Sequence, residues 1–235
     1  MQPWFIWNNR NSYAEGLWVS KLPPIIRAPE RYDEIQVPGR AGSLIMLEDD
    51  EDDIYDRYEK EVTVTAPNTL ALQRILDWLS GSGEVIFSNE SDKTYTARIV
   101  SEVKFNRIDN TMVQAKVRFY VEPFKHERYP AKSKTTLTAN GTIYNPGSVS
   151  SRPLVKITKS SAASNLTVTI GTMAMVFKSF TGTILVDCDA NIITSSGSIW
   201  TGKFTGDFWK IPTGSVSVTR SSACTIEIEP RWRWK

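Results

Sequence analysis

The 235-residue sequence predicts a mostly β protein with two domains. Three observations favour this class. Apolar and polar residues alternate with period two in several segments, most regularly over residues 111–121, as in strands that bury one face. Only one segment has the i, i+3, i+4 apolar spacing of an amphipathic helix. The composition changes near residue 130, beyond which acidic residues become scarce and Ser, Thr and Gly become frequent.

The N-terminal region predicts a strand followed by a long arm. Residues 4–7 are aromatic or apolar and end at a polar turn, as in a short strand. The arm covers about residues 22–60, and its prolines exclude a helix there. So long an irregular segment is either a surface loop or a segment with a function. We expect its apolar residues to be buried against a neighbouring copy: Ile25, Ile26, Ile35, Val37, Leu44, Ile45 and Leu47.

An acidic run covers residues 48–53, with Asp56 just beyond it. Mutual repulsion argues against its burial, so we expect it in solvent or facing a wide lumen. The run lacks the interleaved glycine and terminal glutamate of an EF-hand loop, which argues against a calcium site.

The remainder of the first domain predicts one helix among strands. Residues 61–65 alternate as a half-buried strand. A helix is expected at about 69–80, with Gly81 as its left-handed end and one apolar face formed by Leu72, Ile75, Leu76 and Leu79. The segments 84–87 and 95–103 predict a hairpin with its turn at 89–92. The strand at 111–121 is expected to end at Glu122-Pro123.

The second half predicts an antiparallel sandwich. Short β-rich segments are separated by turns of Gly, Asn, Asp or Ser, at the spacing typical of that architecture. The predicted strands are residues 154–158, 166–170, 173–177, 183–186, 216–219 and 225–228. We therefore divide the chain into domains at 1–130 and 131–235.

Composition also restricts the function. The 28 basic and 26 acidic residues nearly balance, which gives no electrostatic reason for nucleic acid or membrane as the main partner. No apolar run approaches the roughly 20 residues needed to cross a bilayer, so no membrane insertion is expected. Cys188 and Cys224 predict two free buried thiols. With His126 as the only histidine, we expect no metal site and no cofactor.

The order of several motifs resembles the siphophage distal tail protein (Dit) family over nearly the whole chain. In the first half these are the aromatic first strand, residues 37–42 (VPGRAG), the helix that ends in Trp78-Leu79, and residues 117–125 (VRFYVEPFK). In the second half they are residues 143–147 (IYNPG), 153–157 (PLVKI), 182–187 (GTILVD), 202–204 (GKF) and 211–214 (IPTG).

The resemblance implies an N-terminal β-sandwich with one α-helix and an extended hairpin arm, followed by a C-terminal galectin-like antiparallel β-sandwich. It implies a structural virion protein, made in the host cytoplasm and located at the tail tip. Six copies would form a ring that joins the major tail tube protein to a tail-associated lysin or fibre protein, and receptor-binding proteins could attach to it. Phage DNA would pass through the lumen without specific binding. Carboxylates of Asp49, Asp50, Asp52 and Asp53 would then line the bore and repel the phosphate backbone.

The sequence leaves two other classes of function open. A carbohydrate-binding accessory module would use Trp200, Phe208 and Trp209 to stack on sugars, although such aromatics more often fill a core. A polysaccharide-degrading enzyme would need a carboxylate pair such as Asp187 and Asp189. We expect no catalytic residues, because 190–191 resembles a turn and His126 has no Ser or Cys motif nearby.

Overall fold

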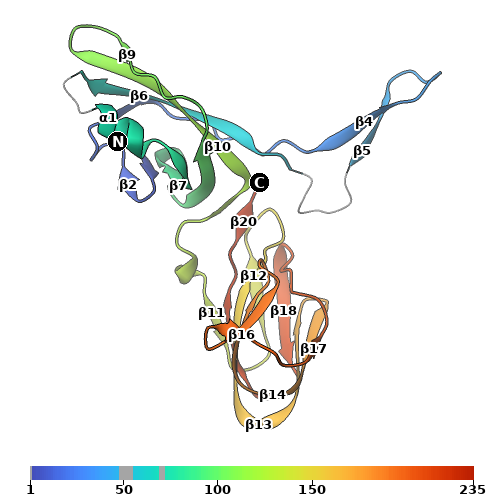
Figure 1. Ribbon diagram of the computed structural model, residues 1–235. Helices are drawn as coiled ribbons and strands as arrows, with labels where there is room; N and C mark the ends of the chain where they lie inside the picture. Colours follow the sequence, from blue (N-terminus) through green and yellow to red (C-terminus); the bar gives the residue numbers. More distant parts are fainter. Residues whose placement is uncertain (1, 48–54, 69–71) are drawn as a thin grey trace. The chain divides into compact units, whose positions relative to one another are not determined.

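The computed structural model describes residues 2–47, 55–68 and 72–235 (Figure 1). The chain divides into two compact units, residues 1–128 with Lys235 and residues 129–234. Strands dominate both units, which confirms the mostly β class. Among the described residues, no helix is long and apolar enough to span a membrane.

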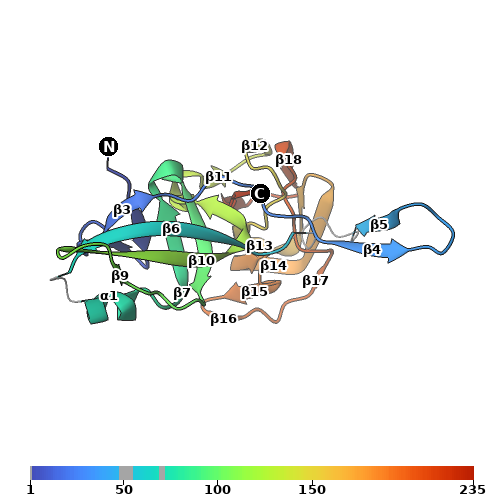
Figure 2. The same ribbon diagram turned by 90° about the horizontal axis from the view of Figure 1, so that it is seen from above.

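The first unit is built on an antiparallel sheet with the order β2-β1-β7-β8-β10-β6-β3, and β9 also pairs with β10. Its strands are β1 (Phe5–Trp7), β2 (Arg10–Asn11), β3 (Trp18–Lys21), β6 (Tyr58–Pro67), β7 (Gly81–Phe87), β8 (Lys93–Ile99), β9 (Asn106–Arg107) and β10 (Met112–Glu127). Both views show β6 and β10 side by side, and their register runs from Met112 opposite Pro67 to Val121 opposite Tyr58 (Figures 1 and 2).

The sheet curls around an aromatic core. Strands β1 and β10 are separated by β7 and β8, so they would lie roughly 14 Å apart in a flat sheet. The ring centroids of Phe5 and Phe119 are nevertheless only 5.6 Å apart, and those of Trp7 and Phe119 are 5.4 Å apart. Curling therefore lets one sheet enclose most of its own apolar face.

Helix α1 (Leu72–Trp78) packs on β1. The Nε1 of Trp7 donates to the carbonyl of Trp78 at 3.0 Å, and the Nε1 of Trp78 donates to the carbonyl of Trp7 at 3.1 Å. Ile75 and Leu79 are buried, and Gly81 has φ +76°, as predicted. Residues 69–71 of the predicted helix lie outside the described residues.

The predicted end of the strand at Glu122-Pro123 is wrong. Strand β10 continues to Glu127, and its pairing with β8 shifts register between Val121 and Lys125. Pro123 lies inside this irregularity, where its missing N–H removes no regular ladder bond. The predicted hairpin of β7 and β8 is confirmed, with the short 3-10 helix η1 (Ser88–Glu90) at its turn.

The second unit is an antiparallel sandwich of nine strands, built on two long ones. Its strands are β11 (Thr135–Leu137), β12 (Gly141–Asn145), β13 (Leu154–Ile170), β14 (Met173–Asp187), β15 (Ile192–Ser195), β16 (Ser198–Ile199), β17 (Phe204–Thr205), β18 (Gly214–Arg220) and β19 (Thr225–Glu229). The last strand, β20 (Arg233–Trp234), does not belong to this sheet. The first half of β13 pairs with β19, and its last residues pair with β18. Bulges between Lys159 and Leu166 mark the change of layer.

The prediction of four short strands between residues 154 and 186 is wrong, because these segments form two long strands. The segments 154–158 and 166–170 join as β13, and 173–177 and 183–186 join as β14. The mostly exposed residues between each pair interrupt the apolar alternation, but the pairing of β13 with β14 resumes beyond the bulges on either side of Ser164. Cys188 and Cys224 are free and buried, as predicted.

Candidate functional site

The arm contains a hairpin of β4 (Tyr32–Gln36) and β5 (Ser43–Leu47), which pair only with each other among the described residues. Figures 1 and 2 show the hairpin extending away from the sheet of its own unit. Its tip begins with a type II turn, because Arg40 N donates to Val37 O at 3.1 Å and Gly39 has φ +82° after Pro38. The sequence of the tip therefore specifies its backbone.

Apolar side chains of the arm lie in solvent. All predicted interface residues with described side chains are exposed: Ile25 60%, Ile26 38%, Ile35 45%, Val37 37%, Leu44 40% and Ile45 62%. The side chain of Leu47 lies outside the described residues. An isolated two-stranded hairpin is marginally stable in water, so this surface has the properties of one that another molecule covers.

Both faces of the hairpin carry apolar groups. Ile35 lies directly opposite Leu44, so these two side chains share one face. Ile45 lies opposite Glu34 on the other face, where Ser43 Oγ donates to the Glu34 carboxylate. The hairpin can therefore be covered from both sides.

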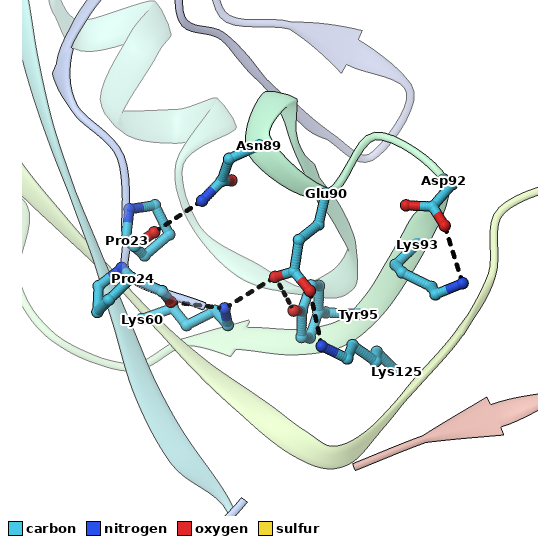
Figure 3. A network of polar contacts seen from close by, with 9 residues as sticks. All are labelled: Pro23, Pro24, Lys60, Asn89, Glu90, Asp92, Lys93, Tyr95 and Lys125. Atoms are coloured by element: carbon cyan, nitrogen blue, oxygen red, sulfur yellow. Dashed lines mark hydrogen bonds and ion pairs between the residues drawn. The ribbon is translucent and has the colours of Figure 1, made fainter. Parts of the chain in front are cut away.

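The start of the arm is tied to the sheet by a buried polar cluster (Figure 3). The Nζ of Lys60 donates to the carbonyl of Pro24 at 3.1 Å and to Glu90 Oε2 at 3.3 Å. The other Glu90 oxygen accepts from Lys125 Nζ at 2.6 Å, and the Tyr95 hydroxyl also donates to this carboxylate. The cluster joins β6, η1, β8 and β10 to the first residues of the arm.

Burial and pairing act in opposite directions on the pKa values of this cluster. Burial lowers the pKa of Lys60, and the Glu90 carboxylate only partly opposes that effect. Burial tends to raise the pKa of Glu90, but hydrogen bonds from Lys125 and Tyr95, together with the charges of Lys60 and Lys125, hold that pKa below its ordinary value. Burial and the bond to Glu90 raise the pKa of Tyr95. Glu90 is therefore an ionised buried carboxylate at neutral pH.

The sequence does not predict this cluster. Glu90 belongs to a polar turn, which predicts exposure, yet its side chain is only 8% exposed. Lys60 carried a signal, because it lies two residues before Val62 and so falls on the inward side of β6. A lysine at an inward strand position requires a buried partner.

The proposed bore-lining residues Asp49, Asp50, Asp52 and Asp53 lie outside the described residues.

The three aromatic residues weighed as a sugar contact are partly or completely buried. Trp209 is completely buried in the core, and its Nε1 donates to Met173 O at 3.1 Å. In this fold the ring of Trp209 has no exposed surface on which a sugar could stack. Trp200 and Phe208 are half-buried and pack against the same core. The ring centroid of Trp200 lies 5.8 Å from that of Phe177.

Asp187 has a structural role. Its carboxylate accepts from both terminal nitrogens of Arg231, at 2.8 and 3.1 Å, and from the backbone N–H groups of Asp189 and Ala190. Burial opposes these bonds, but together they hold the pKa of Asp187 below its ordinary value. His126 lies on β10 opposite Thr94. Among the described residues, no group of His, Cys, Asp and Glu side chains could hold a metal ion.

A comparison with solved structures finds a match, whereas comparisons of the sequence do not. No protein-family model and no curated protein matches the sequence. The fold matches a crystal structure of SPP1 Dit (gp 19.1), described as a paradigm of the hub adsorption apparatus in phages that infect Gram-positive bacteria. The TM-score is 0.76 with 14% sequence identity, and the match covers 100% of each chain. Over its whole length, this chain therefore has the fold of a phage Dit protein.

Proposed function

We propose that this protein is a structural hub of a phage tail: a distal tail protein whose first unit assembles into a ring at the tip of a long non-contractile tail. The observation that carries the proposal is the full-length fold match to a phage hub protein, SPP1 Dit. The exposed arm supplies the second support, because a hub acts through surfaces that other subunits cover.

The arm can supply a substantial part of a subunit contact. Burying a large apolar side chain contributes about 1.5–3 kcal/mol, and the six exposed residues are already about half covered. Their complete burial would therefore contribute roughly 6 kcal/mol per contact, before the cost of ordering the arm. In a head-to-tail ring this contact repeats at every interface, so its contribution grows with the number of subunits.

The finer features of the proposal come from the family resemblance. We propose a homo-hexamer with the major tail tube protein on one side and a tail-associated lysin or fibre protein on the other. Receptor-binding proteins are a further proposed partner of this hub. The virion tail tip is the proposed location.

The acidic run has a proposed role in this ring. Carboxylates of Asp49, Asp50, Asp52 and Asp53 would face the bore and repel DNA as it passes. Replacing these four residues with Asn should slow DNA ejection from assembled particles without reducing the number of particles. Unchanged ejection kinetics would remove this role.

Assembly is tested by size exclusion with light scattering and negative-stain images of the same peak. The wild-type chain should form an open-centred ring, alone or on the tail tube protein. Ile35→Asp with Ile45→Asp should abolish the ring and leave the far-UV circular dichroism spectrum unchanged. Tyr144→Asp is the matched control, because Tyr144 is 66% exposed but belongs to the second unit. A wild-type chain that stays monomeric with and without the tube protein contradicts the proposal.

A further inference from the structure

Lys60 occupies a position that normally holds an apolar residue. It lies on the inward side of β6, its side chain is 0% exposed, and its Nζ lies 4.6 Å from the ring centroid of Tyr95. Burying an ammonium is unfavourable, and an apolar side chain of similar size often serves stability as well or better. Core stability alone therefore does not account for a lysine here.

The distinctive contact of Lys60 is the one to the arm. Its ammonium group donates hydrogen bonds to the Glu90 carboxylate on η1 and to the carbonyl of Pro24 at the start of the arm. Lys60 therefore links the arm to the rest of the first unit. Asn89 makes a parallel contact, because its Nδ2 donates to Pro23 O at 2.9 Å (Figure 3). The side chains of Lys60 and Asn89 thus bind two consecutive backbone carbonyls of the arm.

These carbonyls are the groups through which the start of the arm can be held. Pro23 and Pro24 have no N–H to donate, so their backbones can only accept. They lie between the end of β3 at Lys21 and the start of β4 at Tyr32, where the described backbone pairing is limited to a bridge further along, between Glu30 and Tyr55. Side chains therefore take the place of a backbone ladder at this point.

We propose that Lys60 and Asn89 are positioning residues that fix the direction in which the arm leaves the first unit, so that it meets a neighbouring subunit in one orientation. The inference rests on the proposed ring function. Under this proposal, the residues at the start of the arm determine the orientation in which neighbouring subunits meet. The apolar residues further along the arm supply the contact itself. An arm free to rotate at Pro24 would lose conformational entropy each time it docked.

The test compares Lys60→Met with Lys125→Met in the full chain. Both substitutions remove a buried ammonium that contacts Glu90, but only Lys60 also binds an arm carbonyl. Limited trypsin digestion followed by mass spectrometry measures cleavage after Arg27, which lies beside the buried Ala28. Cleavage there should be at least tenfold faster in Lys60→Met than in wild type, and within threefold of wild type in Lys125→Met.

Asn89→Ala is a second variant that leaves the charged cluster intact. Asn89 is exposed and its substitution should not disturb folding, yet cleavage after Arg27 should be at least threefold faster. In the assembly assay, Lys60→Met and Asn89→Ala should give fewer complete rings than Lys125→Met at the same concentration.

Equal cleavage rates in Lys60→Met and Lys125→Met would overturn the inference, as would a wild-type rate in Asn89→Ala. The digestion is performed on whatever oligomer the wild type forms. If the wild-type chain forms no ring, the proposed function fails, while the cleavage comparison still decides whether these residues hold the arm.

Discussion

Substituting Trp209 separates a structural role in the second unit from a sugar-binding one. Its side chain is 0% exposed, and its ring centroid lies 6.4 Å from that of Phe177. Replacing a buried Trp with Ala typically costs about 3–5 kcal/mol. Loss of the bond to the Met173 carbonyl adds about 1 kcal/mol when that carbonyl stays buried.

The expected change is large for a unit of this size. About 4–8 °C of melting temperature corresponds to 1 kcal/mol in a domain of 60–100 residues, so Trp209→Ala should melt at least roughly 15 °C lower. Calorimetry of the full chain measures this change, and hydrogen exchange in β13 and β14 assigns the transition to the second unit. Trp18→Ala is the control: Trp18 is 40% exposed on the edge strand β3, and its loss should cost below about 1 kcal/mol.

A transition within about 3 °C of wild type, combined with loss of binding on a glycan array, would refute the core assignment of Trp209. Loss of glycan binding together with a large drop in melting temperature would only report unfolding. Trp200→Ala and Phe208→Ala are therefore the better probes for a sugar site, because both side chains are half-buried.

Two further predictions concern the first unit. Because the folded-state pKa of Glu90 lies below its ordinary value of 4.5, its ionised form contributes stability that is present above about pH 4.5 and lost as the pH falls through the folded-state pKa. Glu90→Gln should cost about 3–5 kcal/mol at pH 7, since it leaves buried lysines unpaired, and urea unfolding should show this difference shrinking below pH 4.5; a constant difference would contradict the assignment. Gly39→Ala places a Cβ at φ +82° with nothing within 4 Å of it, so backbone strain of about 1 kcal/mol should weaken the hairpin without a clash. Ring formation by Gly39→Ala should therefore need a higher protein concentration, and an unchanged concentration dependence would show that the turn does not contribute.

The sequence by itself determined most of the local structure. Alternation over 111–121 predicted a strand that lies within β10, and the apolar spacing around Ile75 predicted the helix. The prolines and glycines of the arm indicated an extended segment, and the structure places its apolar side chains in solvent. These features follow from short-range rules, because side-chain period, proline geometry and left-handed glycines act within a few residues.

Only the tertiary structure decided where strands continue through breaks in the apolar pattern and which residues surround each core side chain. The exposed residues between Lys159 and Leu166 break the apolar pattern, and long-range pairing with β14 keeps them in one strand. The sequence favoured a core position for Trp209 because large aromatics usually fill cores, but only the structure shows which residues pack around it.

The same reason applies to the cluster at the start of the arm. Glu90, Lys60 and Lys125 are separated by about 30 residues or more in sequence, and curling of the sheet brings their charges together. Glu90 in its polar turn predicts exposure, since an isolated charge is costly to bury, and only the inward strand position of Lys60 indicates a buried partner. Their mutual pairing permits burial, and pairing between distant residues is a property of the fold.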